Sequence, residues 1–222
     1  MRRLLIHFLA FAAVCLLGAS AAFAQSEPRS TYWVQRATLF ESLPASQDDI
    51  VMLGNSITDG GEWSELLCDA HVKNRGISGD TTDGVLERLG TITRGRPAKV
   101  FLLIGINDFA KGVPPEDIVG NIEKIVRRIK EESPGTLVYV QSILPLNDEI
   151  KMFPGHKAHI SEIPGANAGI LSVCEKTGAG YIDLYSVFVG EDGRMDPKYT
   201  NDGLHLLGTG YLLWASLLRP LL

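Results

Sequence analysis

The residues of this chain best suited to catalysis are one serine and an aspartate–histidine pair that lies far from it in the sequence. Ser56 stands in Leu53-Gly54-Asn55-Ser56-Ile57-Thr58-Asp59, directly after the apolar run 49–53, and this pattern predicts a strand, a tight turn and a helix. Asp202 and His205 are three positions apart, which on a helical turn places both side chains on one side. A serine hydroxyl acts as a nucleophile when a neighbouring base takes its proton. We therefore predict a catalytic triad of Ser56, His205 and Asp202.

A structural role is the alternative for Ser56. For a lone Gly-x-Ser, a turn serine that caps the following helix is the preferred explanation. The stretch also differs from the Gly-x-Ser-x-Gly elbow of α/β-hydrolases, because position 58 is Thr. The Asp–His pair near the carboxyl end is what favours catalysis over capping.

Apolar segments of strand length alternate with segments of helical periodicity along the chain. Residues 99–104 form a continuous apolar run, as expected of a central parallel strand buried on both faces. The alternation predicts a three-layer α/β domain with a five-stranded parallel sheet and right-handed crossovers. We expect strands at 50–53, 71–76, 99–104, 136–142 and 180–184, and helices within 26–46 and at 62–69, 83–91, 116–132, 166–176 and 206–218; the segment 144–164 is expected to be irregular.

The loops after three of these strands should meet at one edge of the sheet, where open α/β sheets place their ligands. Attack on an ester carbonyl creates an oxyanion that needs preorganised hydrogen-bond donors. The backbone N–H groups of Ser56 and Gly79 and the side-chain amide of Asn107 are suitable donors. Glycine suits position 79 because a substrate oxygen can approach its amide closely.

Four short blocks of the chain resemble a known family when they are taken together and in order. They are Gly54-Asn55-Ser56-Ile57-Thr58, Gly79 within 76–80, Gly105-Ile106-Asn107-Asp108, and Asp202-Gly203-Leu204-His205. They are similar to the four sequence blocks of the SGNH hydrolases, also called GDSL-type esterases and lipases. The resemblance runs from about residue 50 to 211 and implies a flavodoxin-like sheet.

The resemblance also implies a serine esterase mechanism. It assigns Ser56 as nucleophile, His205 as general base, Asp202 as its orienting carboxylate, and Ser56, Gly79 and Asn107 as oxyanion-hole donors. The acyl group passes to the serine, the alcohol leaves, and water then hydrolyses the acyl-enzyme; no cofactor or metal is required. Asn55 departs from the family, which has Asp there, and an amide keeps local hydrogen bonds but loses the charge.

The substrate expected from the resemblance is a short acyl ester. The chain looks most like compact bacterial acetylesterases that remove O-acetyl groups from carbohydrates such as sialic acid or polysaccharide. The stretches 74–89 and 183–206 also resemble the catalytic subunits of platelet-activating-factor acetylhydrolase. The alternatives are a lysophospholipase or thioesterase of the same family, which would need a longer apolar groove, and a catalytically silent carbohydrate-binding protein.

The first 24 residues are typical of a secretory signal peptide. Arg2 and Arg3 precede an almost wholly apolar run, and Ala22-Phe23-Ala24 fits the small-x-small cleavage rule. The run is short for a transmembrane span, so we expect no stable membrane insertion after cleavage. These features predict an exported protein, periplasmic or secreted, whose residues 25–222 form a single domain.

The mature chain should be acidic, with no basic run for nucleic acid to bind. Of 21 basic and 26 acidic residues it loses two arginines, which leaves a formal charge of −7. Its two cysteines, Cys68 and Cys174, are expected to be buried small hydrophobes, although export would permit a disulfide. Neither these nor the histidines have zinc-ligand spacing. The oligomeric state stays open.

Several other polar residues near the blocks are given structural roles. We expect Asp108 to fix its loop, Asp80 and Thr82 to cap the next helix, and Asn167 to lie on a helix surface. His156 and His159, three apart, could bind a metal, but we favour solvated loop histidines or part of a substrate lid.

Overall fold

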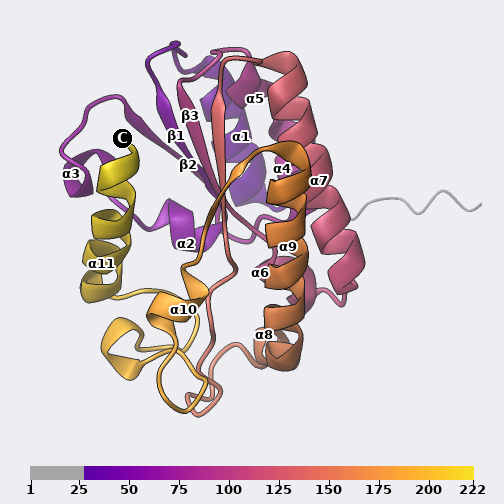
Figure 1. Cartoon of the computed structure of the whole chain (residues 1–222), viewed down its shortest axis with the longest axis vertical. Helices are drawn as coiled ribbons and strands as arrows, with labels where there is room; N and C mark the ends of the chain where they lie inside the picture. Colours follow the sequence, from indigo (N-terminus) through magenta and orange to yellow (C-terminus); the bar gives the residue numbers. More distant parts are fainter. Residues whose placement is uncertain (1–27) are drawn as a thin grey trace, which may run out of the picture.

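The computed structural model describes residues 28–222, so the signal-peptide prediction falls outside the described residues. A single five-stranded parallel sheet runs through the molecule in the order β2-β1-β3-β4-β5, the flavodoxin-like order (Figure 1). All five predicted strands are confirmed, each within a few residues of its expected bounds. The strands are β1 (Ile50–Gly54), β2 (Val72–Gly76), β3 (Lys99–Leu103), β4 (Leu137–Gln141) and β5 (Gly180–Ile182).

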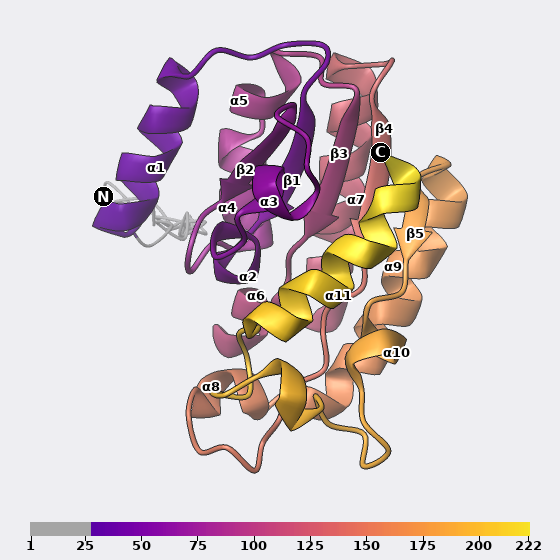
Figure 2. The ribbon, with the colours of Figure 1, turned by 90° about the vertical axis from the view of Figure 1, so that its left-hand side faces the viewer.

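Helices cover both faces of the sheet, which confirms the three layers. Helices α4, α7 and α9 pack beside one another on one face, and α3 and α11 contact each other on the other face (Figures 1 and 2). The α-helices are α1 (Thr31–Ser42), α2 (Ser56–Asp59), α3 (Trp63–Leu66), α4 (Thr82–Arg88), α5 (Gly90–Thr93), α6 (Ile106–Ala110), α7 (Pro115–Glu132), α8 (Pro154–Lys157), α9 (Ile163–Thr177), α10 (Tyr185–Phe188) and α11 (Gly208–Leu218). Short 3-10 turns lie at Ile160–Glu162, Pro197–Tyr199 and Arg219–Leu221.

The register of the central strands determines where the functional loops emerge. Gly54 at the end of β1 pairs with Gly76 of β2 on one side and with Leu103 of β3 on the other. The three strands therefore end level with one another. The loops that carry Ser56, Gly79 and Asn107 leave the same edge of the sheet as neighbours.

Burial of apolar side chains on both faces holds this edge rigid. Phe101 and Leu102 of β3 are fully buried, and so is the apolar stripe of α7, which includes Ile122 and Ile129. Each such side chain contributes about 1.5–3 kcal/mol relative to an exposed one. Pro115 opens α7 at a position where a missing N–H costs nothing, because the first amides of a helix lack intrahelical partners.

The predicted amino-terminal helix is confirmed as α1 and contacts α5. Ser30 caps it by accepting a hydrogen bond from the Trp33 amide at 3.1 Å. Its buried face, with Trp33 and Phe40, packs against Ile77, just before Ser78 and Gly79. Helix α1 thus covers the loop that carries one of the predicted oxyanion donors.

Two expectations about burial are wrong. Cys68 is exposed, because it follows α3 in a left-handed conformation at the surface, with φ of 54°. Cys174 is buried as expected, and burial raises its pKa to about 11; among the described residues both thiols are free. Asn167 is buried rather than on a helix surface, since its amide accepts from the Ile143 N–H at 2.8 Å and donates to the Ile143 carbonyl at 2.9 Å.

The segment 144–164 contains more regular structure than expected. It includes α8 and the 3-10 turn, and α8 packs on α6. The Asn147 amide donates to the Gly203 carbonyl at 2.9 Å, which ties the start of the segment to the loop that carries Asp202. Within residues 28–222, no helix has both the length and the apolar character needed to cross a membrane.

Candidate active site

Ser56 occupies the first position of α2, at the turn that leaves β1. Gly54 is required at the end of the strand because a Cβ there would collide with the Leu103 carbonyl and the Thr58 hydroxyl. Asn55 caps α2 by accepting a hydrogen bond from the Ile57 amide at 3.0 Å. A neutral amide performs this capping, so the local structure does not depend on the charge that Asp would bring.

Ser56, His205 and Asp202 form a continuous chain of hydrogen bonds. The Ser56 Oγ lies 2.9 Å from His205 Nε2, and His205 Nδ1 lies 2.7 Å from Asp202 Oδ2. A carboxylate can only accept at this point, so His205 carries its proton on Nδ1 and its Nε2 accepts from the serine hydroxyl. This is the arrangement in which an imidazole can act as general base.

Asp202 is held by backbone amides rather than by a helix, which corrects the helical turn expected from the spacing. Residues 201–205 form bends, and Asp202 Oδ1 accepts from the amides of Leu204 and His205 at 2.8 Å each. Burial acts to raise the pKa of Asp202, but the hydrogen bonds from His205 and Leu204 outweigh it, so the pKa lies below its ordinary value. The carboxylate therefore stays ionised beside the imidazole.

The three predicted oxyanion donors lie at the same edge of the sheet. Gly79 has a φ of 80°, a left-handed conformation that favours glycine, and Asn107 lies in the first turn of α6. The Asn107 Nδ2 donates to the Asp80 carbonyl at 2.8 Å, which ties the Asn107 side chain to the loop that carries Gly79.

Asp108 fixes the start of α4, in agreement with the structural role expected for it. Its carboxylate accepts from the Thr82 hydroxyl at 2.5 Å and from the Thr82 amide at 3.1 Å. Burial raises the pKa of Asp108 to about 6 despite these bonds. Thr82 is the first residue of α4 rather than its cap, since Thr81 accepts from the Gly84 amide at that position.

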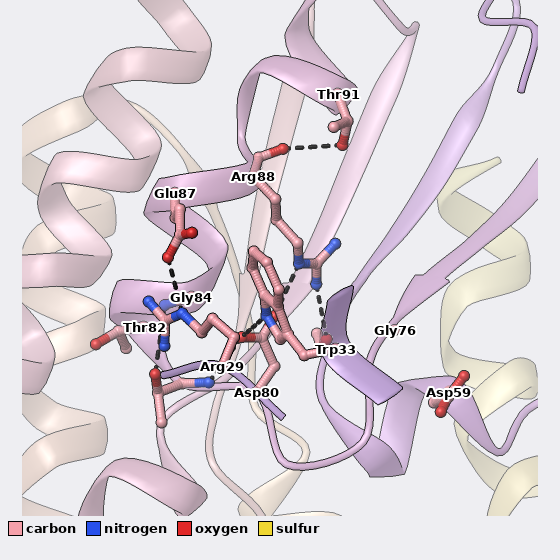
Figure 3. A network of polar contacts seen from close by, with 12 residues as sticks. Arg29, Trp33, Asp59, Gly76, Asp80, Thr82, Gly84, Glu87, Arg88 and Thr91 are labelled. Atoms are coloured by element: carbon pink, nitrogen blue, oxygen red, sulfur yellow. Dashed lines mark hydrogen bonds and ion pairs between the residues drawn. The ribbon is translucent and has the colours of Figure 1, made fainter. Parts of the chain in front are cut away.

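Asp80 forms a buried ion pair instead of capping a helix, which corrects the prediction (Figure 3). Its Oδ2 lies 2.8 Å from Arg88 Nε, and its Oδ1 accepts from Trp33 Nε1 at 2.9 Å. Arg88 Nη2 also donates to the Gly54 carbonyl at 3.1 Å. Burial lowers the pKa of Arg88, and the Asp80 charge opposes that shift. One buried pair therefore links the strand before Ser56, the Gly79 loop and α1.

The segment 144–164, whose two histidines were expected to be solvated or part of a substrate lid, places side chains beside Asn107 and His205. His156 Nε2 lies 2.9 Å from Asn107 Oδ1, so His156 is half-buried rather than a solvated loop histidine. The Phe153 ring meets His205 edge-to-face with 5.2 Å between centroids. His159 instead pairs with Glu162 at 2.7 Å. Among residues 28–222, no three His, Cys, Asp or Glu side chains are grouped so that they could hold a metal ion.

A small apolar cavity of about 10 Å³ lies beside the turn that carries Ser56. Its lining includes Asn55 and Ile57, the two sequence neighbours of Ser56, and Ile106, the residue before Asn107. Such a volume holds roughly one water-sized group. The lining residues are Asn55, Ile57, Leu103, Ile104, Ile106, Ile143, Leu144 and Leu146.

An all-parallel five-stranded sheet in this order, flanked by helices, is the fold of the SGNH hydrolases. Residues 52–213 match the GDSL-like Lipase/Acylhydrolase family, and the chain belongs to this family of carboxylic-ester hydrolases. The family predicted from the four blocks is thereby confirmed.

Relatives with similar sequences and structures agree with this assignment. The chain is 28% identical over 196 residues to platelet-activating factor acetylhydrolase IB subunit alpha2 of Gallus gallus, covering 85% of this chain and 81% of the relative. It is 29% identical to subunit alpha1 of Bos taurus, over 79% of this chain and 75% of the relative. The structure of a GDSL-like lipase from Bacteroides thetaiotaomicron superposes with a TM-score of 0.73 at 26% identity, over 85% of this chain and 96% of the other.

Proposed function

We propose that this esterase hydrolyses short acyl esters through an acyl-serine intermediate on Ser56. The observation that carries the proposal is the hydrogen-bonded chain from Ser56 Oγ through His205 to Asp202, with distances of 2.9 and 2.7 Å. Its geometry is that of a nucleophile, a base and a group that orients the base.

The proposed reaction has two steps, acylation of Ser56 and hydrolysis of the acyl-enzyme. Ser56 Oγ attacks the ester carbonyl while His205 Nε2 takes the hydroxyl proton, and the resulting oxyanion faces Ser56 N–H, Gly79 N–H and Asn107 Nδ2. The ester C–O bond then breaks, and His205 returns the proton to the departing alcohol. In the second step water attacks the acyl-enzyme by the same route and releases the acid. Asp202 stabilises the imidazolium in both steps.

The names of the curated relatives, which are acetylhydrolases, support an acetyl group as the preferred acyl group. The apolar cavity of about 10 Å³ is lined by the sequence neighbours of Ser56 but not by Ser56, Gly79 or Asn107, so it is not assigned to the acyl group. A lysophospholipase or thioesterase of the same family is the alternative.

We further propose that the alcohol is a carbohydrate, such as an O-acetylated sugar or polysaccharide. The support is the resemblance of the sequence blocks to compact bacterial acetylesterases. Export of the protein is likewise a proposal, and it depends only on the composition of residues 1–24.

Initial hydrolysis rates of p-nitrophenyl acetate, butyrate, octanoate and palmitate test the acyl preference and the nucleophile together. We expect acetate to be fastest and octanoate to be at least tenfold slower. Ser56→Ala should abolish turnover, whereas Ser216→Ala, which alters an exposed serine on α11, should leave it unchanged. Far-UV circular dichroism verifies that both variants are folded.

Each adverse result has a distinct meaning. Activity retained by folded Ser56→Ala would refute the nucleophile assignment. Preference for octanoate or palmitate would instead refute the short-acyl proposal and favour the lipid or thioester alternative. Equal inactivity of wild type and Ser56→Ala on every short ester would favour a silent binding protein. Acetate release from acetylated xylan and from O-acetylated sialic acid, measured enzymatically, then tests the carbohydrate.

A further inference from the structure

The side-chain amide of Asn107 is held at both of its polar atoms. Its Nδ2 donates to the Asp80 carbonyl at 2.8 Å, and its Oδ1 lies 2.9 Å from His156 Nε2. A backbone carbonyl can only accept, so the amide nitrogen must face Asp80 and the amide oxygen must face His156. His156 therefore carries its proton on Nε2 and donates it to Asn107. One N–H of the amide is then left for a substrate oxygen.

His156 is in turn placed by the contacts of α8. Helix α8 packs on α6, which carries Asn107, and three residues further on the His159 ring stacks on Phe109 of α6 at 6.0 Å between centroids. Lys157 Nζ donates to the Asp202 carbonyl at 3.1 Å. The helix that carries His156 is thus attached to both the Asn107 side and the Asp202 side of the site.

Phe153, just before α8, adopts a strained conformation that serves the same placement. Its φ is 53°, a left-handed value that costs about 1–3 kcal/mol for such a residue and persists only where the surroundings impose it. The Phe153 ring lies edge-to-face with both His156, at 5.8 Å, and His205, at 5.2 Å. One ring therefore confines the two imidazoles at once.

The electrostatic environment keeps His156 neutral. Burial lowers its pKa from the ordinary value, and the nearby charges of His205 and Lys157 lower it further. A neutral imidazole donates through one nitrogen only, and the contact with Asn107 requires that nitrogen to be Nε2. Because His156 carries no charge, it does not oppose the positive charge that His205 acquires during attack.

We propose that His156 is a positioning residue of the oxyanion hole: it donates to Asn107 Oδ1 and thereby aims the free N–H of Asn107 at the oxyanion. A hydrogen bond to the amide oxygen also polarises the amide, which strengthens its N–H as a donor. The proposal rests on the function proposed above, since it requires an oxyanion at that place. It predicts an effect on the transition state and little effect on substrate binding.

His156→Gln and His156→Asn form a matched pair for testing this role. The glutamine amide nitrogen reaches the place of His156 Nε2, whereas the asparagine amide ends about one bond short of Asn107. Loss of a whole oxyanion donor costs about 10²–10³ in kcat. A donor that is present but unaligned should cost less, so we expect His156→Asn to lower kcat for p-nitrophenyl acetate roughly tenfold. The KM should stay within about twofold, and His156→Gln should recover most of the rate.

A second readout separates positioning from a general structural role. An aryl trifluoromethyl ketone forms a hemiketal when Ser56 Oγ bonds to its carbonyl carbon, the proton passes to His205, and the former carbonyl oxygen becomes the oxyanion. Its inhibition constant should rise in His156→Asn by about the factor by which kcat falls. His71→Gln, which alters an exposed histidine just before β2, should change neither quantity by more than about twofold.

The outcomes distinguish this inference from the proposed function. If Ser56→Ala is inactive but His156→Asn keeps the wild-type kcat and inhibition constant, the role of His156 is refuted and the serine mechanism stands. Equal losses in His156→Gln and His156→Asn, or a change confined to KM, would also refute it. If folded Ser56→Ala remains active, the proposed function itself fails.

Discussion

Breaking the buried pair between Asp80 and Arg88 should cost much of the stability of the protein. Both side chains are 0% exposed, and their closest atoms are 2.8 Å apart (Figure 3). Asp80→Asn keeps the shape and the acceptor for Trp33 Nε1 but leaves the Arg88 cation without its counter-charge. Removing one partner of a buried pair costs about 3–5 kcal/mol. For a domain of this length, that lowers the melting temperature by roughly 6–20 °C.

Arg88→Met and the double variant show how much of the lost free energy of unfolding depends on the interaction between Asp80 and Arg88. Arg88→Met removes the cation and its bond to the Gly54 carbonyl, and it leaves the Asp80 carboxylate with donors from Trp33 and Thr81 alone. The double variant Asp80→Asn, Arg88→Met contains no unpaired buried charge. We expect its loss to be at least about 2 kcal/mol smaller than the sum of the two single losses.

Urea unfolding followed by circular dichroism measures all three free energies. Glu123→Gln is the matched control, since it breaks the exposed pair with Arg127 and should cost less than about 0.5 kcal/mol. A loss below about 1 kcal/mol in Asp80→Asn would contradict the reasoning. Strict additivity in the double variant would contradict it as well, because it would mean that the two charges do not depend on each other.

Three further predictions concern single groups of the site. Asp202→Asn should lower kcat roughly 10²–10⁴-fold at unchanged fold, because an amide that donates to His205 Nδ1 forces the proton onto Nε2; steady-state kinetics measure it. Gly79→Ala should cost about 1–2 kcal/mol through its φ of 80° alone, since no atom lies within 4 Å of the added Cβ, and urea unfolding measures this. The raised pKa of Asp108, about 6, gives stability that is present below its unfolded pKa near 4 and lost as the pH rises through 6. Relative to Asp108→Asn, the wild type should thus lose roughly 2.5 kcal/mol of unfolding free energy between pH 4 and 7; equal pH profiles would refute this.

The sheet and the three residues of the hydrogen-bonded chain could be predicted because their signals are local. The apolar run 99–104 and the turn residues around Ser56 depend only on neighbours in the sequence. Parallel strands then bring their carboxyl ends to one edge, and the observed register, which pairs Gly54 with Gly76 and Leu103, makes these ends level. The meeting of these strand ends could therefore be predicted without knowing any side-chain contact.

The roles of Asp80, Asn167 and His156 could not be predicted, because each depends on a partner that no local pattern identifies. Asp80 precedes a helix, and an aspartate in that position is most often a cap. It is a buried ion because tertiary packing places Arg88 and Trp33 against it. From the sequence, Asn167 is expected on the surface. It is buried because the chain after β4 places the backbone N–H and carbonyl of Ile143 beside its amide. His156 lies in a polar segment whose path across α6 is fixed by tertiary packing.

Two carboxylates near the edge of the sheet that carries Ser56, those of Asp80 and Asp59, are each paired with an arginine. A developing oxyanion is opposed by any uncompensated negative charge nearby. Asp80 is neutralised by Arg88, and Asp59 is paired with Arg36 at 3.7 Å while it accepts from Tyr32.

Asp108 directly follows Asn107, the proposed oxyanion donor, and has no cation as partner among the described residues. Its carboxylate is instead held by the Thr82 hydroxyl and amide, and its raised pKa means that it gives up its charge below about pH 6. The pair of Asp80 with Arg88 therefore has two effects at once: it removes a charge that would oppose the oxyanion, and it fixes the carbonyl that holds Asn107. Asp80→Asn removes the carboxylate and leaves the Arg88 cation, whose charge would favour an oxyanion, so any fall in kcat reports the position of Asn107 rather than the field of a carboxylate.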